Sequence, residues 1–152
     1  MRLALCALRI WDPMTKTLPK QQNHPELLAP AGNIESFFAA LEHGADAIYV
    51  GHRHHSARAL AANFTLEEIA RLREYAHGHG VKLYVALNAI VREDELADLI
   101  GVLSGLAQIQ PDGLIIQDGA VARLCRLYFP NLATHASTLM TVHNRAGVEQ
   151  LQ

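Results

Sequence analysis

Three histidines lie within four residues of the sequence, at His52, His54 and His55. Neutral imidazole is a good ligand for zinc and related ions, so this run is a candidate metal site. No cysteine or carboxylate lies nearby in the sequence to complete a coordination sphere. The pattern therefore favours an exposed polar loop over a metal centre.

A histidine and a serine two residues apart, His135 and Ser137, follow an apolar run near the end of the sequence. Residues two apart share a face of an extended strand, and Asp118 could lie on a neighbouring loop, which would bring together the residue types of a hydrolytic triad. Shared orientation does not place the hydroxyl on an imidazole nitrogen. We therefore favour hydrogen bonding of this pair to a ligand or to the backbone.

A wider set of polar side chains lies near the ends of the predicted strands, where ligands of α/β proteins gather. Together these groups could bind a polar small molecule, whereas each one alone is equally well explained as a cap or a loop hydrogen bond, Asp118 above all. The predicted substrate-binding set is Arg58, Asn63, Asn88, Gln117, Asp118, His135 and Ser137.

Common catalytic and cofactor motifs are missing from the sequence. It contains no GxGxxG after its first strand and no GxxxxGK[ST], HExxH or GxSxG. Cys6 and Cys125 match no CxxC spacing, so neither a disulfide framework nor a zinc site is indicated. Leu124 and Leu127 flank Cys125 and favour a buried structural thiol.

Short aliphatic runs alternate with segments of helical period from Pro25 onward, which is typical of βα units around a parallel sheet. Asn33 and Asp118 are expected to cap helices, and Thr65 with Glu68 forms a capping box before another. A fifth helix is expected near Asn144. Strands are predicted at 26–29, 47–50, 82–87, 114–116 and 132–135, and longer helices at 93–107 and 118–129.

The predicted fold class is α/β, with about five parallel strands alternating with helices. Such strands could be part of a TIM-like (β/α) barrel or an open doubly wound sheet, and periodicity alone does not separate the two. The 152 residues are too few for a complete eight-unit barrel, which needs about 250. We therefore expect a leader over 1–24, loosely ordered, and the N-terminal part of a barrel domain over 25–152.

Composition limits the partners of the chain. A formal net charge of -2 gives no basic field for nonspecific nucleic-acid binding, although specific RNA contact stays open. No stretch approaches the roughly 20 apolar residues that span a bilayer, so no membrane association is expected. With its few cysteines, the composition fits a reducing, cytoplasmic setting.

Six words in fixed order resemble the collagenase-like peptidases of family U32. They are ELLAPAGN (26–33), GADAIYVG (44–51), ARALAANFTLEE (57–68), LYVALNAIV (83–91), LIIQDGAV (114–121) and HASTLMTVHN (135–144). The predicted substrate-binding set lies within these words, whereas the run from His52 to His55 departs from the family pattern. The resemblance implies a barrel-like fold whose later strands and cysteine-rich segment would follow Gln152.

The same resemblance implies a function for the full-length protein. Members have been linked to hydroxylation of transfer RNA, ribosomal RNA or ubiquinone precursors, with an iron-sulfur cluster and, for some, prephenate. Cysteines for such a cluster are expected beyond Gln152, because neither Cys6 nor Cys125 matches them. The alternatives are a collagenase-like peptidase and an inert fragment that self-associates through its unfinished sheet.

Overall fold

The computed structural model describes residues 25–57 and 62–151 of the chain. The predicted leader over 1–24 and the candidate residue Arg58 lie outside the described residues, as does Cys6.

Five parallel strands form one open sheet in the order β1-β2-β3-β4-β5. A doubly wound sheet reverses its strand order at a switch point, and no reversal occurs among these strands. The α/β fold with five parallel strands is confirmed, in the consecutive order that neighbouring strands of a barrel have. The strands are β1 (Leu28–Ala31), β2 (Ala47–Gly51), β3 (Lys82–Leu87), β4 (Gly113–Ile116) and β5 (Thr134–Ala136).

Helices alternate with the strands, and their predicted caps are confirmed. The side chains of Asn33, Thr65 and Asp118 accept hydrogen bonds from the first turns of α1, α2 and α4, and Asn144 does so for α5. No helix within the described ranges has the length and apolar character needed to span a bilayer. The helices are α1 (Ile34–Glu42), α2 (Leu66–Gly78), α3 (Leu96–Ile109), α4 (Gly119–Tyr128) and α5 (Arg145–Gln150), with 3-10 turns η1 (Glu93–Glu95) and η2 (Thr138–Met140).

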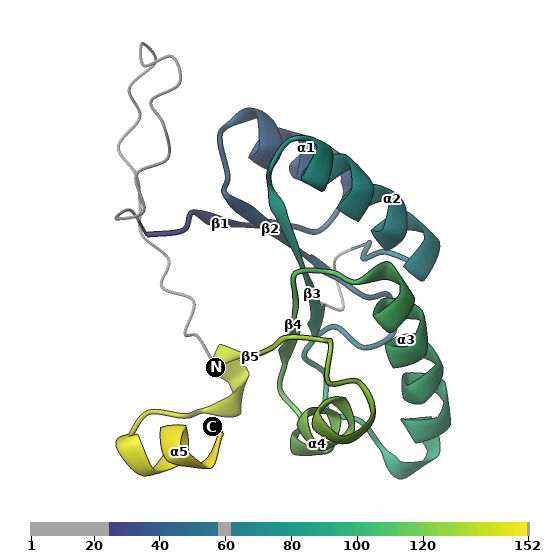
Figure 1. Cartoon of the computed structure of the whole chain (residues 1–152), viewed down its shortest axis with the longest axis vertical. Helices are drawn as coiled ribbons and strands as arrows, with labels where there is room; N and C mark the ends of the chain where they lie inside the picture. The colour runs from purple at the N-terminus through teal and green to yellow at the C-terminus, as the bar shows by residue number, and fades with distance from the viewer. Residues whose placement is uncertain (1–24, 58–61, 152) are drawn as a thin grey trace.

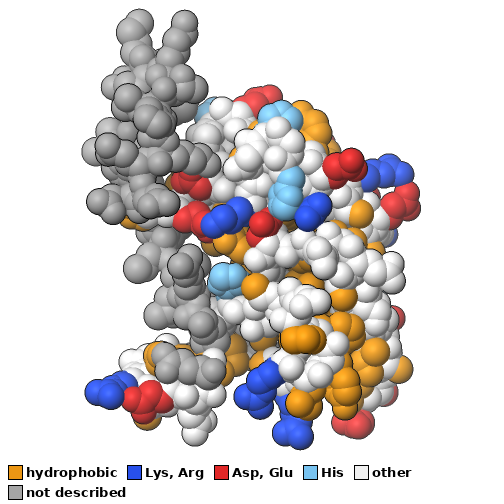
Figure 2. Space-filling model, in the orientation of Figure 1, with side chains coloured by type: hydrophobic (Ala, Val, Ile, Leu, Met, Phe, Trp, Pro, Cys, Tyr) orange, Lys and Arg blue, Asp and Glu red, His pale blue; other side chains and the backbone are white. Residues whose placement is uncertain are grey.

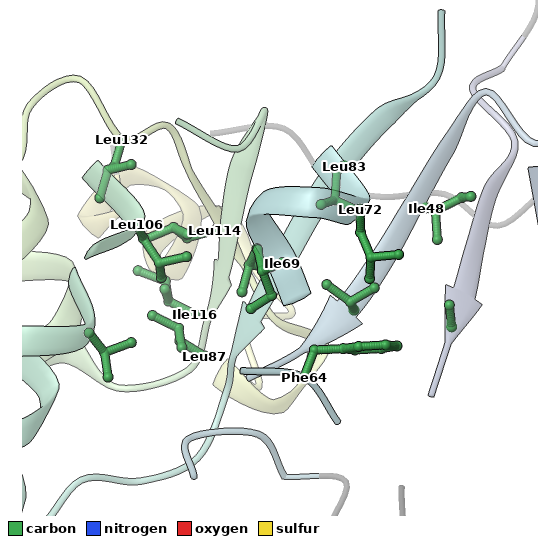
Figure 3. Close-up of a cluster of buried hydrophobic side chains, with 14 of the residues drawn as sticks. Ile48, Phe64, Ile69, Leu72, Leu83, Leu87, Leu106, Leu114, Ile116 and Leu132 are labelled. Carbon is green, nitrogen blue, oxygen red and sulfur yellow. The ribbon is translucent and has the colours of Figure 1, made fainter. Parts of the chain in front are cut away.

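Helices α1 to α4 lie along one side of the sheet, whereas α5 stands apart from them (Figure 1). Alternate strand residues point toward these helices and form the hydrophobic core with them (Figure 3). Leu83 and Leu114 from the strands and Ile69 and Leu106 from the helices are fully buried in it. The core therefore fixes which strand residues face away from the helices.

The opposite side of the sheet carries the remaining strand residues and is here called the His135 face. Residues paired in a parallel register point to the same side, and Tyr84 pairs with Gly113 while Ile115 pairs with Ala86 and with His135. The His135 face is thus defined by Tyr84, Ala86, Gly113, Ile115 and His135.

Two strand predictions were displaced along the chain. Pro30, predicted in a turn, lies within β1. Proline is tolerated there because β1 is an edge strand, and the N–H that proline lacks would have pointed to the unpaired side of the strand. Leu132, predicted in the fifth strand, is buried but belongs to the turn after α4, where its N–H donates to the Phe129 carbonyl at 3.0 Å. The predicted helix over 93–107 begins as the separate turn η1.

Candidate functional site

Successive loops at the carboxyl ends of the strands are tied to one another by hydrogen bonds. The Asn88 side-chain oxygen accepts the Ala57 N–H at 3.1 Å, which joins the loop after β3 to the loop after β2. The Ser137 N–H donates to the Ile116 carbonyl at 2.8 Å and joins the segment after β5 to the last residue of β4. Part of the predicted polar rim therefore holds the loops in place.

Asp118 uses both carboxylate oxygens in this structural role. One oxygen accepts the Val91 N–H at 3.0 Å from the loop after β3, and the other accepts the Ala120 N–H at 2.7 Å and caps α4. The Ser137 hydroxyl likewise accepts the Leu139 N–H at 3.2 Å and begins η2. Asp118, His135 and Ser137 are not hydrogen-bonded to one another, so no triad is assembled among the described residues.

Asn63 is buried in a conformation that favours glycine or asparagine, with φ of 48°. Its side-chain oxygen lies so close to Gly51 that a Cβ there would be 2.3 Å away. Asn63 therefore packs against the end of β2 in the interior, not on an accessible rim.

Gln117 and His135 differ from the other predicted site residues. Neither side chain has a hydrogen-bond partner among the described residues, and both residues are half-buried. Gln117 directly follows the last residue of β4, at the carboxyl edge of the sheet. These two side chains are the ones that the fold leaves available to a ligand.

Tyr84 is a neighbour of His135 that the sequence analysis did not single out. The two rings meet edge to face, with centroids 5.0 Å apart and planes at 66°. The Tyr84 hydroxyl donates to Glu26 at 3.1 Å, and Lys82 donates to the other oxygen of that carboxylate at 2.6 Å. The alternation of Lys82 and Tyr84 with aliphatic residues in strand 82–87 was the available signal for a polar face.

The three clustered histidines do not converge on a metal position. His52 and His55 are buried with their rings stacked at 5.6 Å, whereas His54 is exposed. Within the described ranges, no group of three or more histidine, cysteine, aspartate or glutamate side chains is arranged to hold a metal ion. The expected exposed loop is thus correct for His54 and wrong for His52 and His55.

The buried His52 imidazole is held in its neutral form. Burial lowers its pKa to about 4, with further lowering by His55 and His54. Its Nδ1 accepts the His54 N–H over a long 3.5 Å, which a protonated nitrogen could not do. His55 Nε2 lies 3.3 Å from Asp98 without the geometry of a hydrogen bond.

A shallow hollow of about 400 Å³ lies beside these histidines, between the loop after β2 and the first turns of α2 and α3. Its lining includes Arg53 and His54 together with Glu67 and Asp98. Both signs of charge are therefore present, and the lining favours neither an anionic nor a cationic ligand.

The described residues do not fit an iron-sulfur cluster. Clusters are bound by several cysteine thiolates, and Cys125 is the one cysteine in the described ranges. It is 2% exposed within the core, and burial raises its pKa to about 11, so it stays a thiol at neutral pH. The predicted structural role of Cys125 agrees with this environment.

Curated relatives share clear sequence similarity with the chain. The tRNA hydroxylation protein P1 of Bacillus subtilis (strain 168) is 38% identical over 125 residues, which cover 82% of this chain and 30% of the relative. The 23S rRNA 5-hydroxycytidine C2501 synthase of Escherichia coli (strain K12) is 40% identical over 113 residues, which cover 74% of this chain and 17% of the relative. The chain thus spans under a third of the length of either protein.

A solved structure has the same fold. The U32 peptidase Mk0906 superposes with a TM-score of 0.69 at 15% identity, over 93% of this chain and 61% of that one. The sequence pattern of peptidase family U32 matches residues 32–152, which is most of the chain. The expectation raised by the six sequence words is confirmed, and the chain belongs to peptidase family U32.

Proposed function

We propose that this chain is part of an RNA hydroxylation enzyme, in which His135, on the His135 face, and Gln117, directly after β4, contribute to the pocket for a pyrimidine base. The observation that carries the proposal is that these two side chains, alone among the described candidates, have no hydrogen-bond partner within residues 25–57 and 62–151. The names of the Bacillus subtilis and Escherichia coli relatives supply the reaction class.

Imidazole and carboxamide groups suit recognition of a base. Sequence-specific RNA recognition mostly uses unpaired bases, whose edges are read by hydrogen bonds. Gln117 offers two N–H donors and one oxygen acceptor, and a neutral His135 offers one of each. The pair can therefore bind the amide-like edge of a pyrimidine.

The charge of the surface agrees with recognition by such local contacts. On the face shown in Figure 2, acidic and basic side chains are scattered among hydrophobic and uncharged ones, and the sequence has a net charge of -2. A phosphate backbone is bound chiefly by concentrated positive charge. We therefore expect the affinity for RNA to depend on contacts with the base and its loop more than on electrostatic attraction of the phosphate backbone.

The proposal extends to the cofactor, partners and location of the enzyme. We propose that an iron-sulfur cluster is bound by residues outside the described ranges, and that a small polar anion such as prephenate takes part. A cytoplasmic location follows from an RNA substrate. Self-association through the edges of the open sheet is proposed for the alternative in which the chain is an inert fragment, because unpaired strand edges invite pairing.

A peptidase function is the weaker alternative. Hydrolysis by a serine nucleophile requires a base within hydrogen-bonding reach of its hydroxyl. The Ser137 hydroxyl instead accepts the Leu139 N–H, and Asp118 is used in two backbone hydrogen bonds. These contacts favour the hydroxylation proposal.

The test is to take the gene as it stands in its genome and to express it in a host strain from which the host's own RNA hydroxylation proteins have been deleted. Mass spectrometry of digested transfer and ribosomal RNA should then detect hydroxylated pyrimidines. The variants His135→Ala and Gln117→Ala should each lower the modified fraction by on the order of 10-fold to 100-fold.

Matched controls separate a site effect from a general one. His43→Ala removes an exposed histidine at the end of α1, and Gln108→Ala removes an exposed carboxamide on α3. Both should retain wild-type modification. Absence of hydroxylated pyrimidines with the wild-type gene would refute the proposal.

A further inference from the structure

We propose that Tyr84 is a positioning residue for His135, and that Gly113 provides the space in which the two rings meet. This inference rests on the proposed function for the use to which His135 is put. The arrangement of the three residues can be tested without that function. The relevant surface is the His135 face, where β4 lies between the strands that carry the two rings.

Gly113 is required by the neighbouring rings and not by its own backbone. A Cβ at this position would lie 2.7 Å from both Cδ2 and Nε2 of His135 and 3.2 Å from Cδ1 of Tyr84. Its φ lies outside the positive range that favours glycine, so any residue could adopt this backbone conformation. The missing side chain therefore lets His135 reach across β4 to Tyr84.

Tyr84 is itself fixed at both ends. Its ring is 8% exposed, and its hydroxyl donates to Glu26, whose second carboxylate oxygen accepts from Lys82. Burial, and after it the charge of Glu26, raise the pKa of the Tyr84 hydroxyl above its usual value. The hydroxyl therefore stays protonated and keeps donating, which gives His135 a rigid neighbour.

Packing holds the His135 ring in place and leaves its polar atoms unused. The contact with Tyr84 is edge to face at 5.0 Å, a favourable geometry for aromatic rings. Neither imidazole nitrogen has a hydrogen-bond partner among the described residues. A ring oriented by packing alone keeps a nitrogen free to bind a ligand such as a pyrimidine edge.

The first test is NMR of the full 152-residue chain with labelled histidine. The His135 ring protons, assigned by their loss in His135→Ala, should show a ring-current shift from Tyr84. Tyr84→Leu should abolish that shift, and Tyr84→Phe should retain it because the aromatic ring remains. Gly113→Ala should change it, since the added methyl displaces the imidazole.

The second test measures RNA hydroxylation in cells. Tyr84→Leu should lower it on the order of 10-fold to 100-fold and no further than His135→Ala does, because Tyr84 acts through His135, while Tyr84→Phe should retain most of the activity because the ring remains. The double variant Tyr84→Leu with His135→Ala should show no less RNA hydroxylation than His135→Ala alone, because both changes abolish the same contribution of His135. Activity of the phenylalanine variant would show that the function requires the aromatic ring and not the hydroxyl.

The outcomes distinguish this inference from the proposed function. An unchanged His135 shift in Tyr84→Leu, additive losses in the double variant, or full activity of Tyr84→Leu would each overturn the positioning role. If the wild-type gene produces no hydroxylated RNA, the proposed function fails, and the NMR result alone decides whether Tyr84 orients His135.

Discussion

At the scale of single residues, His52 shows how burial changes a side chain that looked like a metal ligand. Its imidazole is 5% exposed and is stacked on His55, another buried ring. A charged imidazole would lose hydration there and would be repelled by a charged neighbour. His52 is therefore a neutral structural residue whose protonation should oppose folding.

We predict that His52 makes the fold sensitive to acid. The folded pKa is about 4 and the unfolded value 6.5, so in this window the unfolded chain binds more protons and stability falls as pH falls. The loss should approach about 3 kcal/mol by pH 4. Urea unfolding of wild type and of His52→Gln between pH 7 and 4 measures it, and the variant should show the weaker dependence. Equal slopes for the two proteins would contradict the assignment.

At the scale of elements, the hydrogen bonds between successive loops make the carboxyl edge of the sheet a connected structure. Asp118 joins the loop after β3 to the start of α4, and Asn88 joins that loop to the one after β2. Each bond uses a side chain that could otherwise have bound a ligand. Gln117 and His135 can be held in place only if this edge of the sheet is ordered.

Replacing Asp118 with alanine should destabilise the fold by about 2 to 3 kcal/mol, because two backbone N–H groups lose a charged acceptor. Asp118→Asn keeps one good acceptor and should lose less. Asp94→Ala is the matched control, since that carboxylate is exposed and pairs with Arg92 on the surface. Urea unfolding curves at pH 7 provide the comparison. A loss for Asp94→Ala as large as that for Asp118→Ala would argue against a specific clamp.

At the scale of the whole molecule, one core joins the sheet to helices α1 to α4 (Figure 3). Helix α3 presents both environments within one turn, with Leu103 fully buried and Ile100 44% exposed. The two positions therefore offer a direct comparison of buried and exposed aliphatic side chains on the same helix.

Leu103→Ala should lower the free energy of unfolding by about 2 to 5 kcal/mol, because it leaves a cavity in the core. Ile100→Ala should cost less than about 1 kcal/mol, since a half-exposed side chain leaves no closed cavity. Thermal and urea unfolding followed by circular dichroism should show a single transition for both variants. Similar losses at the two positions would mean that α3 is not packed as described.

Much of the fold could be predicted from local patterns. The strand at 82–87 and the caps at Asn33, Thr65 and Asp118 were predicted correctly, because strand alternation and capping are properties of a few neighbouring residues. The errors at Pro30 and Leu132 have a common cause. A proline is tolerated in an edge strand, and a buried leucine can lie in a turn, and neither fact is visible before the neighbours are known.

The sequence by itself determined the α/β class, the family and the set of polar residues near the strand ends, because these depend on periodicity and on short words of fixed order. The tertiary structure decided which of those polar side chains are used by the fold and which stay available. It also brought Tyr84, Gly113 and His135 together from three strands. That contact depends on strand order and register, which pair residues far apart in sequence and leave no local pattern.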